Sequence, residues 1–421
     1  MRKRWAWCLP VLLFMACAGS APSENAFRPS RYDWPQWQGP ERTTISRETG
    51  LLKEWPKDGP KLVWKVKGLG GGYSTPSVAA GRIFGMGYHG DDEVVWARDE
   101  KNGQELWSRR IAKANHHVGY GEGSRCTPTV DGERTYALGV SGDIVCLETA
   151  TGKEVWHRNL VNDFEGGVPG WGYCESPLVD GDKVICTPGG SKATLVALDK
   201  KTGETIWQAK VPQGDGAQYS SVIAADVDGQ QQYIQFLHQG VVGVAAADGK
   251  FLWRYDRPAN GTANCSTPIY SEARVFAASG YGTGGGLVKL SRVDGEVKAE
   301  QVYFTRDMKN QHGGMVLVGG YLYGSNEGEL VCLEFKTGEV KWREHRPGKG
   351  SIAYADGCLY YRNEGGPIIL VEANPKKYVE HGRFDQPDRS NSPAWAHPVI
   401  ANGKLYIRDQ DLLFCYDVKQ K

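Results

Sequence analysis

One stretch decides the fold: residues 195–207 have the sequence LVALDKKTGETIW. Its apolar start, residues 195–198, predicts a buried strand, and Thr202-Gly203 predicts a tight turn because glycine accepts positive φ without steric cost. Trp207 marks a second strand, since aromatic residues favour strands. The pattern returns at residues 99–107, 148–156, 248–253 and 334–342, and in weaker form at 294–303. The chain is therefore a series of repeats.

The spacing of the repeats indicates the architecture. Successive tryptophans lie 43, 49, 51 and 46 residues apart, at Trp64, Trp107, Trp156, Trp207 and Trp253. A period of about 40–50 residues with four short strands per unit is typical of propeller blades. Motifs such as Thr75-Pro76 open the innermost strand, because the missing N–H of proline is tolerated at a strand start. Adding the outer strands near Tyr303, Trp342 and Phe384 gives eight blades in one all-β domain.

The two ends of the repeat series predict how the ring closes. The last unit, residues 393–418, supplies three strands and has no tryptophan strand. A spare strand of that kind lies at residues 62–66. We therefore expect this N-terminal strand to complete the last blade and to leave no open sheet edge.

Composition excludes several classes of protein. The 421 residues carry 50 Lys+Arg and 49 Asp+Glu, so the formal net charge of +1 argues against nucleic-acid binding. The 55 glycines and 34 Trp and Tyr residues fit a turn-rich β protein. Ten cysteines include no CxxC motif and no adjacent pair, so the spacing of a metal cluster is absent and no metal site is predicted.

The N-terminus predicts export. Three basic residues precede a short apolar run, so residues 1–21 are interpreted as a signal peptide, residues 22–32 as a polar tether and residues 33–421 as the propeller. Cleavage before Cys17 would leave a lipidated cysteine and an outer-membrane-anchored lipoprotein. Ordinary cleavage after Ala18 or Ala21 would release a periplasmic protein. A lipid at Cys17 is the only membrane attachment that we expect.

The repeat resembles the PQQ-like unit Ala-x-Asp-x-x-Thr-Gly-x-x-x-Trp of eight-bladed quinoprotein propellers. Residues 197–207 are nearly a consensus copy, and residues 33–40, DWPQWQGP, resemble the opening of exported planctomycete-type propellers. Two groups of relatives imply different functions. BamB-type envelope lipoproteins are non-catalytic scaffolds for outer-membrane assembly. PQQ-dependent alcohol dehydrogenases hold their quinone with Ca²⁺ beside a disulfide of adjacent cysteines, a pair that this chain lacks.

Candidate site residues lie in the loops that lead into the innermost strands, because these loops meet over the axial channel. They form a mixed polar and aromatic rim that would suit a planar polyanion such as PQQ with Ca²⁺, or another small molecule. The selected rim residues are Tyr73, Arg125, Glu175, Tyr219, Asn264 and His312. Cys126 and Cys174 are left open as a disulfide pair. Trp34 and Trp37 either cap one channel mouth or pack beneath the last blade.

The sequence thus favours an exported, non-catalytic binding or scaffold protein that interacts with envelope proteins, and no catalytic residue is assigned. The alternative is a periplasmic PQQ-dependent dehydrogenase of alcohols or sugars, in which the rim would hold the quinone.

Overall fold

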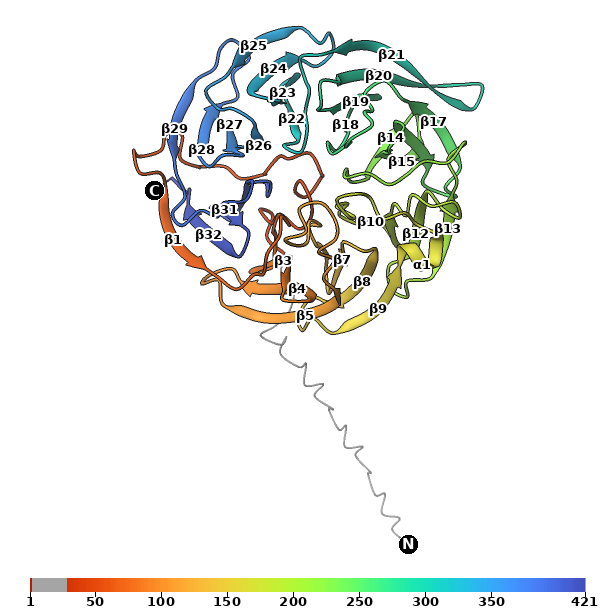
Figure 1. The fold of residues 1–421 in the computed structure, drawn as a ribbon, viewed down its shortest axis with the longest axis horizontal. Coiled ribbons are helices and arrows are strands. Elements are labelled where there is room, and N and C mark those ends of the chain that lie inside the picture. Colours follow the sequence, from red (N-terminus) through yellow and green to blue (C-terminus); the bar gives the residue numbers. More distant parts are fainter. Residues whose placement is uncertain (2–28, 421) are drawn as a thin grey trace.

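The protein is an eight-bladed β-propeller in the computed structural model, which describes residue 1 and residues 29–420. Figure 1 shows a disc in which eight four-stranded antiparallel sheets surround a central axis. This confirms the fold class and the blade count. Among the described residues, no helix is long and apolar enough to cross a membrane. The predicted signal peptide and Cys17 lie outside the described residues.

The first four blades run in chain order, each from its innermost to its outermost strand. Blade 1 contains β2 (Ser77–Ala79), β3 (Arg82–His89), β4 (Asp92–Asp99) and β5 (Glu105–Lys113). Blade 2 contains β6 (Thr129–Asp131), β7 (Arg134–Leu138), β8 (Asp143–Glu148) and β9 (Glu154–Asn159), followed by the short helix α1 (Leu160–Phe164). Blade 3 contains β10 (Leu178–Asp180), β11 (Lys183–Cys186), β12 (Leu195–Asp199) and β13 (Thr205–Ala209). Blade 4 contains β14 (Ile223–Val227), β15 (Gln230–Phe236), β16 (Val241–Ala245) and β17 (Phe251–Tyr255).

The remaining blades follow the same order until the last one. Blade 5 contains β18 (Ile269–Ser271), β19 (Arg274–Ser279), β20 (Gly284–Val293) and β21 (Glu296–Thr305). Blade 6 contains β22 (Met315–Val318), β23 (Tyr321–Asn326), β24 (Glu329–Glu334) and β25 (Val340–Glu344). Blade 7 contains β26 (Gly350–Ala355), β27 (Cys358–Asn363), β28 (Ile368–Glu372) and β29 (Glu380–Phe384). Blade 8 combines β30 (Val399–Ala401), β31 (Lys404–Asp409) and β32 (Leu412–Asp417) with β1 (Lys61–Val66).

The pairing of β1 with β32 closes the ring as the sequence predicts. Trp64 lies opposite Cys415 and Val66 lies opposite Leu413, so the N-terminal strand is the outermost strand of blade 8. Strands from the two ends of the chain thus share one sheet.

The geometry of the repeat explains its sequence. The aromatic side chain of an outermost strand packs on the turn of the next blade. The indole N–H of Trp107 donates to the Thr149 carbonyl at 3.1 Å, and that of Trp156 donates to the Lys200 carbonyl at 3.1 Å. The Trp107 ring packs on Gly152 of the Thr-Gly turn. Trp253 is an exception, since its indole N–H donates to Gln232 of its own blade.

This packing predicts that replacing a turn glycine by alanine lowers the free energy of unfolding by an amount that depends on how close the aromatic ring lies. A Cβ at Gly152 would lie 2.5 Å from Trp107, whereas a Cβ at Gly132 would have no atom within 4 Å, although both residues have positive φ. We expect Gly132→Ala to lower the free energy of unfolding by about 1 kcal/mol and Gly152→Ala by about 2–4 kcal/mol. Urea denaturation measures both values, and equal losses would contradict the docking account.

A segment that the repeat does not predict fills the central channel. We call residues 33–48 the channel segment, and Figure 1 shows this part of the chain crossing the middle of the disc. Trp34 exchanges backbone hydrogen bonds with Val78 of β2, and the Ser46 hydroxyl donates to the Ile400 carbonyl of β30. Arg42 is buried and donates to the carbonyls of Ser176, Pro177 and Val222, at the entries of blades 3 and 4.

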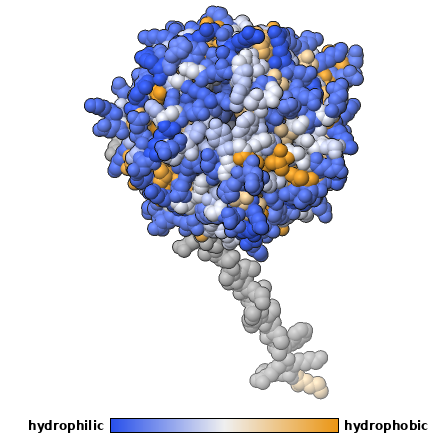
Figure 2. All heavy atoms as spheres, in the orientation of Figure 1, coloured by the Kyte–Doolittle hydropathy of each residue, from blue (hydrophilic) through white to orange (hydrophobic). Residues whose placement is uncertain are grey.

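Two cavities lie along the channel segment. Trp34 packs in the core with 2% of its surface exposed, whereas Trp37 faces a cavity at one mouth of the channel. A second cavity, which includes Gln38, Arg42 and Thr44 in its wall, lies along the same segment. The face of the disc seen in Figure 2 is mainly hydrophilic, with small separate apolar patches.

Candidate functional site

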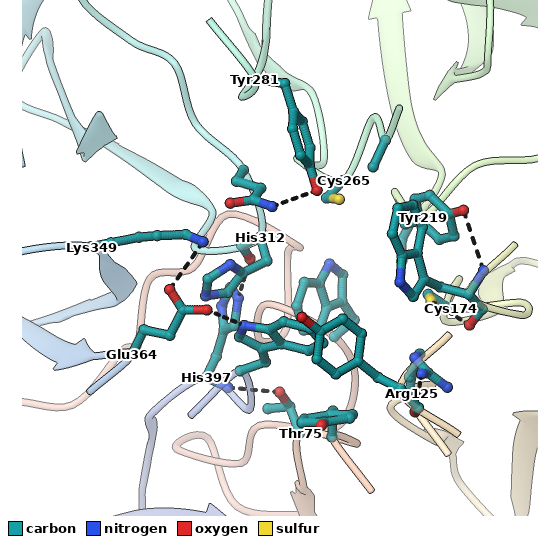
Figure 3. Close-up of a pocket in the computed structure, with 18 residues that line it drawn as sticks. Thr75, Arg125, Cys174, Tyr219, Cys265, Tyr281, His312, Lys349, Glu364 and His397 are labelled. Carbon is teal, nitrogen blue, oxygen red and sulfur yellow. Dashed lines mark hydrogen bonds and ion pairs between the residues drawn. The ribbon is translucent and has the colours of Figure 1, made fainter. Parts of the chain in front are cut away.

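The candidate site is the cavity of about 250 Å³ at the channel mouth, where the innermost strands begin. One residue from each blade faces it, always six positions before the last residue of the innermost strand. We call these eight residues the axial ring: Tyr73, Arg125, Cys174, Ser221, Cys265, His312, Lys349 and Trp395. Other lining residues include Trp37, Tyr120, Trp171, Tyr219, Tyr281, Gln311, Glu364 and His397 (Figure 3).

Four of the six predicted rim residues line the cavity, namely Tyr73, Arg125, Tyr219 and His312. The other two, Glu175 and Asn264, each lie next to an axial-ring position and are turned into the protein. Glu175 is 1% exposed and accepts hydrogen bonds from the backbone N–H and the hydroxyl of Thr187, at 2.8 and 2.9 Å. Asn264 is 0% exposed and donates to the carbonyl of Leu237 at 2.9 Å. Neighbouring residues of an extended chain point in opposite directions, which explains both errors.

Glu175 gives the protein a specific pH dependence. Burial raises its pKa to about 7. Because the folded-state pKa is raised, stability from this group is present at low pH and is lost as pH rises from about 4.5 through 7. We expect the unfolding free energy of the wild type to fall by about 2 kcal/mol relative to Glu175→Gln between pH 5 and pH 8.

Urea denaturation at several pH values measures this difference, with Glu133→Gln at an exposed side chain as the matched control. A difference between wild type and Glu175→Gln that does not change with pH would contradict the assignment.

Aromatic rings form two walls of the cavity. Trp395 packs against Tyr73 and Tyr120 with ring centroids 4.7 and 4.6 Å apart. Trp171 and Tyr219, from the loops before blades 3 and 4, pack edge to face at 5.3 Å. Tyr120 and Tyr281 are each 47% exposed, so they stand at the mouth. The result is an aromatic cavity that is open at one end.

Three charged side chains belong to the wall, and they differ in their partners. Lys349 and Glu364 form an ion pair at 3.0 Å, and the Trp395 indole N–H donates to the same carboxylate at 2.6 Å. Arg125 donates to the carbonyls of Gly119 and Gly123 and has no ion-pair partner among the described residues. Arg125 is therefore the one charged side chain of the lining that has no ion-pair partner in the part of the chain that the structure describes.

The pKa values of the two histidines and two cysteines in the wall are shifted away from neutral pH. Burial lowers the pKa of His397 to about 4, and burial together with Lys349 and His397 lowers the pKa of His312 well below its usual value. Burial raises the pKa of the Cys174 thiol to about 11 and that of Cys265 to about 12. At pH 7 both histidines are neutral and both cysteines are thiols.

The open question of the Cys126–Cys174 disulfide is also answered. All eight cysteines among the described residues are free. Cys126 follows the axial-ring residue Arg125 and is buried in the blade, where it accepts a hydrogen bond from Leu138 N–H at 3.4 Å. Cys174 faces the cavity, so the two thiols lie on opposite sides of the wall.

Comparisons with known proteins identify similar chains in two functional groups. The family described as "Outer membrane protein assembly factor BamB" matches residues 91–344. BamB of Burkholderia pseudomallei is 24% identical over 272 residues, which cover 60% of this chain and 62% of that protein. The chain spans about three fifths of the length of the first curated relatives that it matches.

Two solved structures share the fold. BamB of Moraxella catarrhalis has a TM-score of 0.54 at 15% identity, covering 86% of this chain and 98% of that one. Quinohemoprotein alcohol dehydrogenase of Comamonas testosteroni has a TM-score of 0.64 at 13% identity, covering 93% and 81%. Identities this low establish the architecture alone.

The residues of the cavity do not fit PQQ with Ca²⁺. Calcium takes six to eight oxygen ligands, but the one carboxylate of the lining, Glu364, is already bonded to Lys349 and Trp395. Among the described residues, no group of three His, Cys, Asp or Glu side chains is placed to hold a metal ion. A planar polyanion would also meet the single uncompensated cation Arg125.

We therefore predict that the purified protein shows no saturable heat when it is titrated with PQQ and Ca²⁺ by calorimetry, at concentrations up to about 1 mM. Saturable micromolar binding that is lost in Arg125→Ala would contradict the conclusion that the cavity does not fit PQQ with Ca²⁺. It would support a quinoprotein.

Proposed function

We propose, from the premise that this chain belongs to the family of outer membrane protein assembly factor BamB, that it is an exported, non-catalytic binding protein of the cell envelope. In this role it offers its loops and blade faces to proteins of the outer-membrane assembly machinery. No chemical step is assigned to it.

One observation carries the non-catalytic part of the proposal: the histidines and cysteines of the cavity wall have pKa values shifted away from neutral pH. Catalytic acids, bases and nucleophiles need pKa values matched to their task. Here the shifts of His397, Cys174 and Cys265 all run in the opposite direction. The channel segment is consistent with a scaffold role, because its hydrogen bonds connect blades 1, 3, 4 and 8.

The proposal includes attachment through Cys17, which lies outside the described residues; the described chain begins near one face of the disc. Asp33 accepts hydrogen bonds from Asn402 and from the Ala80 N–H, both in turns at the far end of the innermost strands. The described chain thus enters the disc on the face opposite the cavity.

Deleting the gene in the native bacterium tests the role. We expect lower amounts of outer-membrane β-barrel proteins and greater sensitivity to large antibiotics that an intact outer membrane excludes. Complementation with the wild-type gene and with Arg125→Gln should restore both, since the proposed scaffold role does not use the cavity. Unchanged barrel-protein levels and unchanged sensitivity in the deletion strain would contradict the proposal.

A further inference from the structure

We propose that the axial cavity binds a flat aromatic compound that carries a single carboxylate, of the size of one or two fused rings. This inference goes beyond the scaffold role and does not depend on it. It rests on the arrangement of the walls, on the charge at one end and on the polar groups that remain unpaired.

The walls form a slot between two aromatic groups. The order of the blades places Trp395 and Tyr73, from blades 8 and 1, on one side of the axis, and Trp171 and Tyr219, from the loops before blades 3 and 4, on the other. Trp395 is held in one orientation by its hydrogen bond to Glu364 and by ring contacts with Tyr73 and Tyr120. Rigid aromatic walls favour a planar aromatic ligand, because ring stacking gains energy without ordering flexible side chains.

The charge lies at one end of the slot. Arg125 belongs to the axial ring of blade 2, between the two aromatic walls, and its guanidinium lies 5.6 Å from the centre of the Tyr73 ring. Its hydrogen bonds to loop carbonyls hold it in place and neutralise none of its charge. Since Glu364 pairs with Lys349, Arg125 is the lining residue that is left to pair with a ligand carboxylate.

Unpaired polar atoms lie at the opposite end, in blade 6. Both ring nitrogens of His312 are inaccessible to solvent and have no hydrogen-bond partner. His397 donates from Nε2 to the His312 carbonyl at 2.9 Å, which leaves its Nδ1 unpaired as well. Unsatisfied buried groups of this kind are costly, so a ligand with a ring N–H or hydroxyl near this end would gain a hydrogen bond when an imidazole turns toward it.

One feature argues against a sugar. Most of the polar side chains that would bind its many hydroxyls are already paired with each other: Lys349 with Glu364, Glu364 with Trp395, and Gln311 with the Tyr281 hydroxyl at 2.7 Å. The cavity volume of about 250 Å³ suits a compound of one or two rings.

Calorimetric titration of the purified protein with indole-3-acetate, indole-3-acetamide and glucose tests the inference. We expect the acid to bind with a Kd of about 10–100 µM and the isosteric neutral amide to bind about tenfold more weakly. Glucose should give no saturable heat.

Variants of Arg125 test the role of its charge. Arg125→Gln should weaken binding of the acid about tenfold, to the level of the amide, whereas Arg125→Lys should stay within about threefold of wild type. Arg134→Gln, at a half-buried arginine outside the cavity that also donates to a backbone carbonyl, is the matched control and should not change the affinity for either ligand.

Three results would overturn the inference: no saturation by the acid up to about 5 mM, equal affinity for acid and amide in the wild type, or tighter binding of glucose than of the acid. None of them bears on the deletion phenotype, so failure here is distinguishable from failure of the scaffold role.

Discussion

A chain that begins at residue 67 is expected not to form a stable propeller. It lacks β1, so β32 loses its hydrogen-bonded neighbour and blade 8 keeps three strands. The same truncation removes Trp64, whose ring packs within about 3 Å of the position that a Gly103 side chain would take in blade 1. Because no other pairing of strands from the two ends closes a blade among the described residues, we expect aggregation at the exposed edge, or a midpoint of thermal unfolding lowered by more than about 10 °C.

Two longer chains are the controls for this prediction. Residues 50–421 lack the channel segment and keep β1, and residues 30–421 keep both. Size-exclusion chromatography and thermal unfolding should show a closed monomeric ring for both. Equal stability of residues 67–421 and residues 30–421 would contradict the claim that the pairing of β1 with β32 stabilises the closed ring.

Arg408→Met is expected to lower the free energy of unfolding by about 3–5 kcal/mol. Arg408 is fully buried and donates to the carbonyls of Ser74, Met86 and Gly70, so it ties blade 8 to blade 1. Burial lowers its pKa to about 9, which still leaves it charged at pH 7. Methionine would fill the space and leave the three carbonyls without a donor.

The same junction continues into blade 7, because Arg362 donates to the carbonyl of Arg408. Urea denaturation measures the loss, with Arg292→Met at an exposed arginine as the control. A change below about 1 kcal/mol at Arg408 would show that the buried guanidinium does not hold the two blades together.

The fold was predictable from the sequence because one physical unit recurs. Each Thr-Gly turn needs glycine both for positive φ and for contact with the preceding blade's ring, so Gly152 and Trp107 appear together at regular spacing. The channel segment has no such signal. Arg42 recognises backbone carbonyls, which are common to every sequence, so its partners could not be predicted from side chains.

The site was predictable in part. Positions fixed by the repeat, such as Tyr73 and Arg125, could be placed on the rim by counting from the strand. An error of one residue reverses the direction of a side chain in extended backbone, which is why Glu175 and Asn264 were wrong. Trp37 lines the cavity from the channel segment, and Glu364 lines it from a turn within blade 7. Neither position recurs in the repeat, so the repeat could not predict them.

The central claim is that this propeller acts by binding an envelope partner and performs no chemistry of its own. The most direct measurement is quantitative mass spectrometry of the affinity-tagged protein, captured from the native envelope after mild cross-linking. We predict a component of the outer-membrane protein assembly machinery in near-stoichiometric amount, equally with wild type and with Arg125→Gln. Recovery of the chain alone, loaded with a quinone cofactor, would contradict the account.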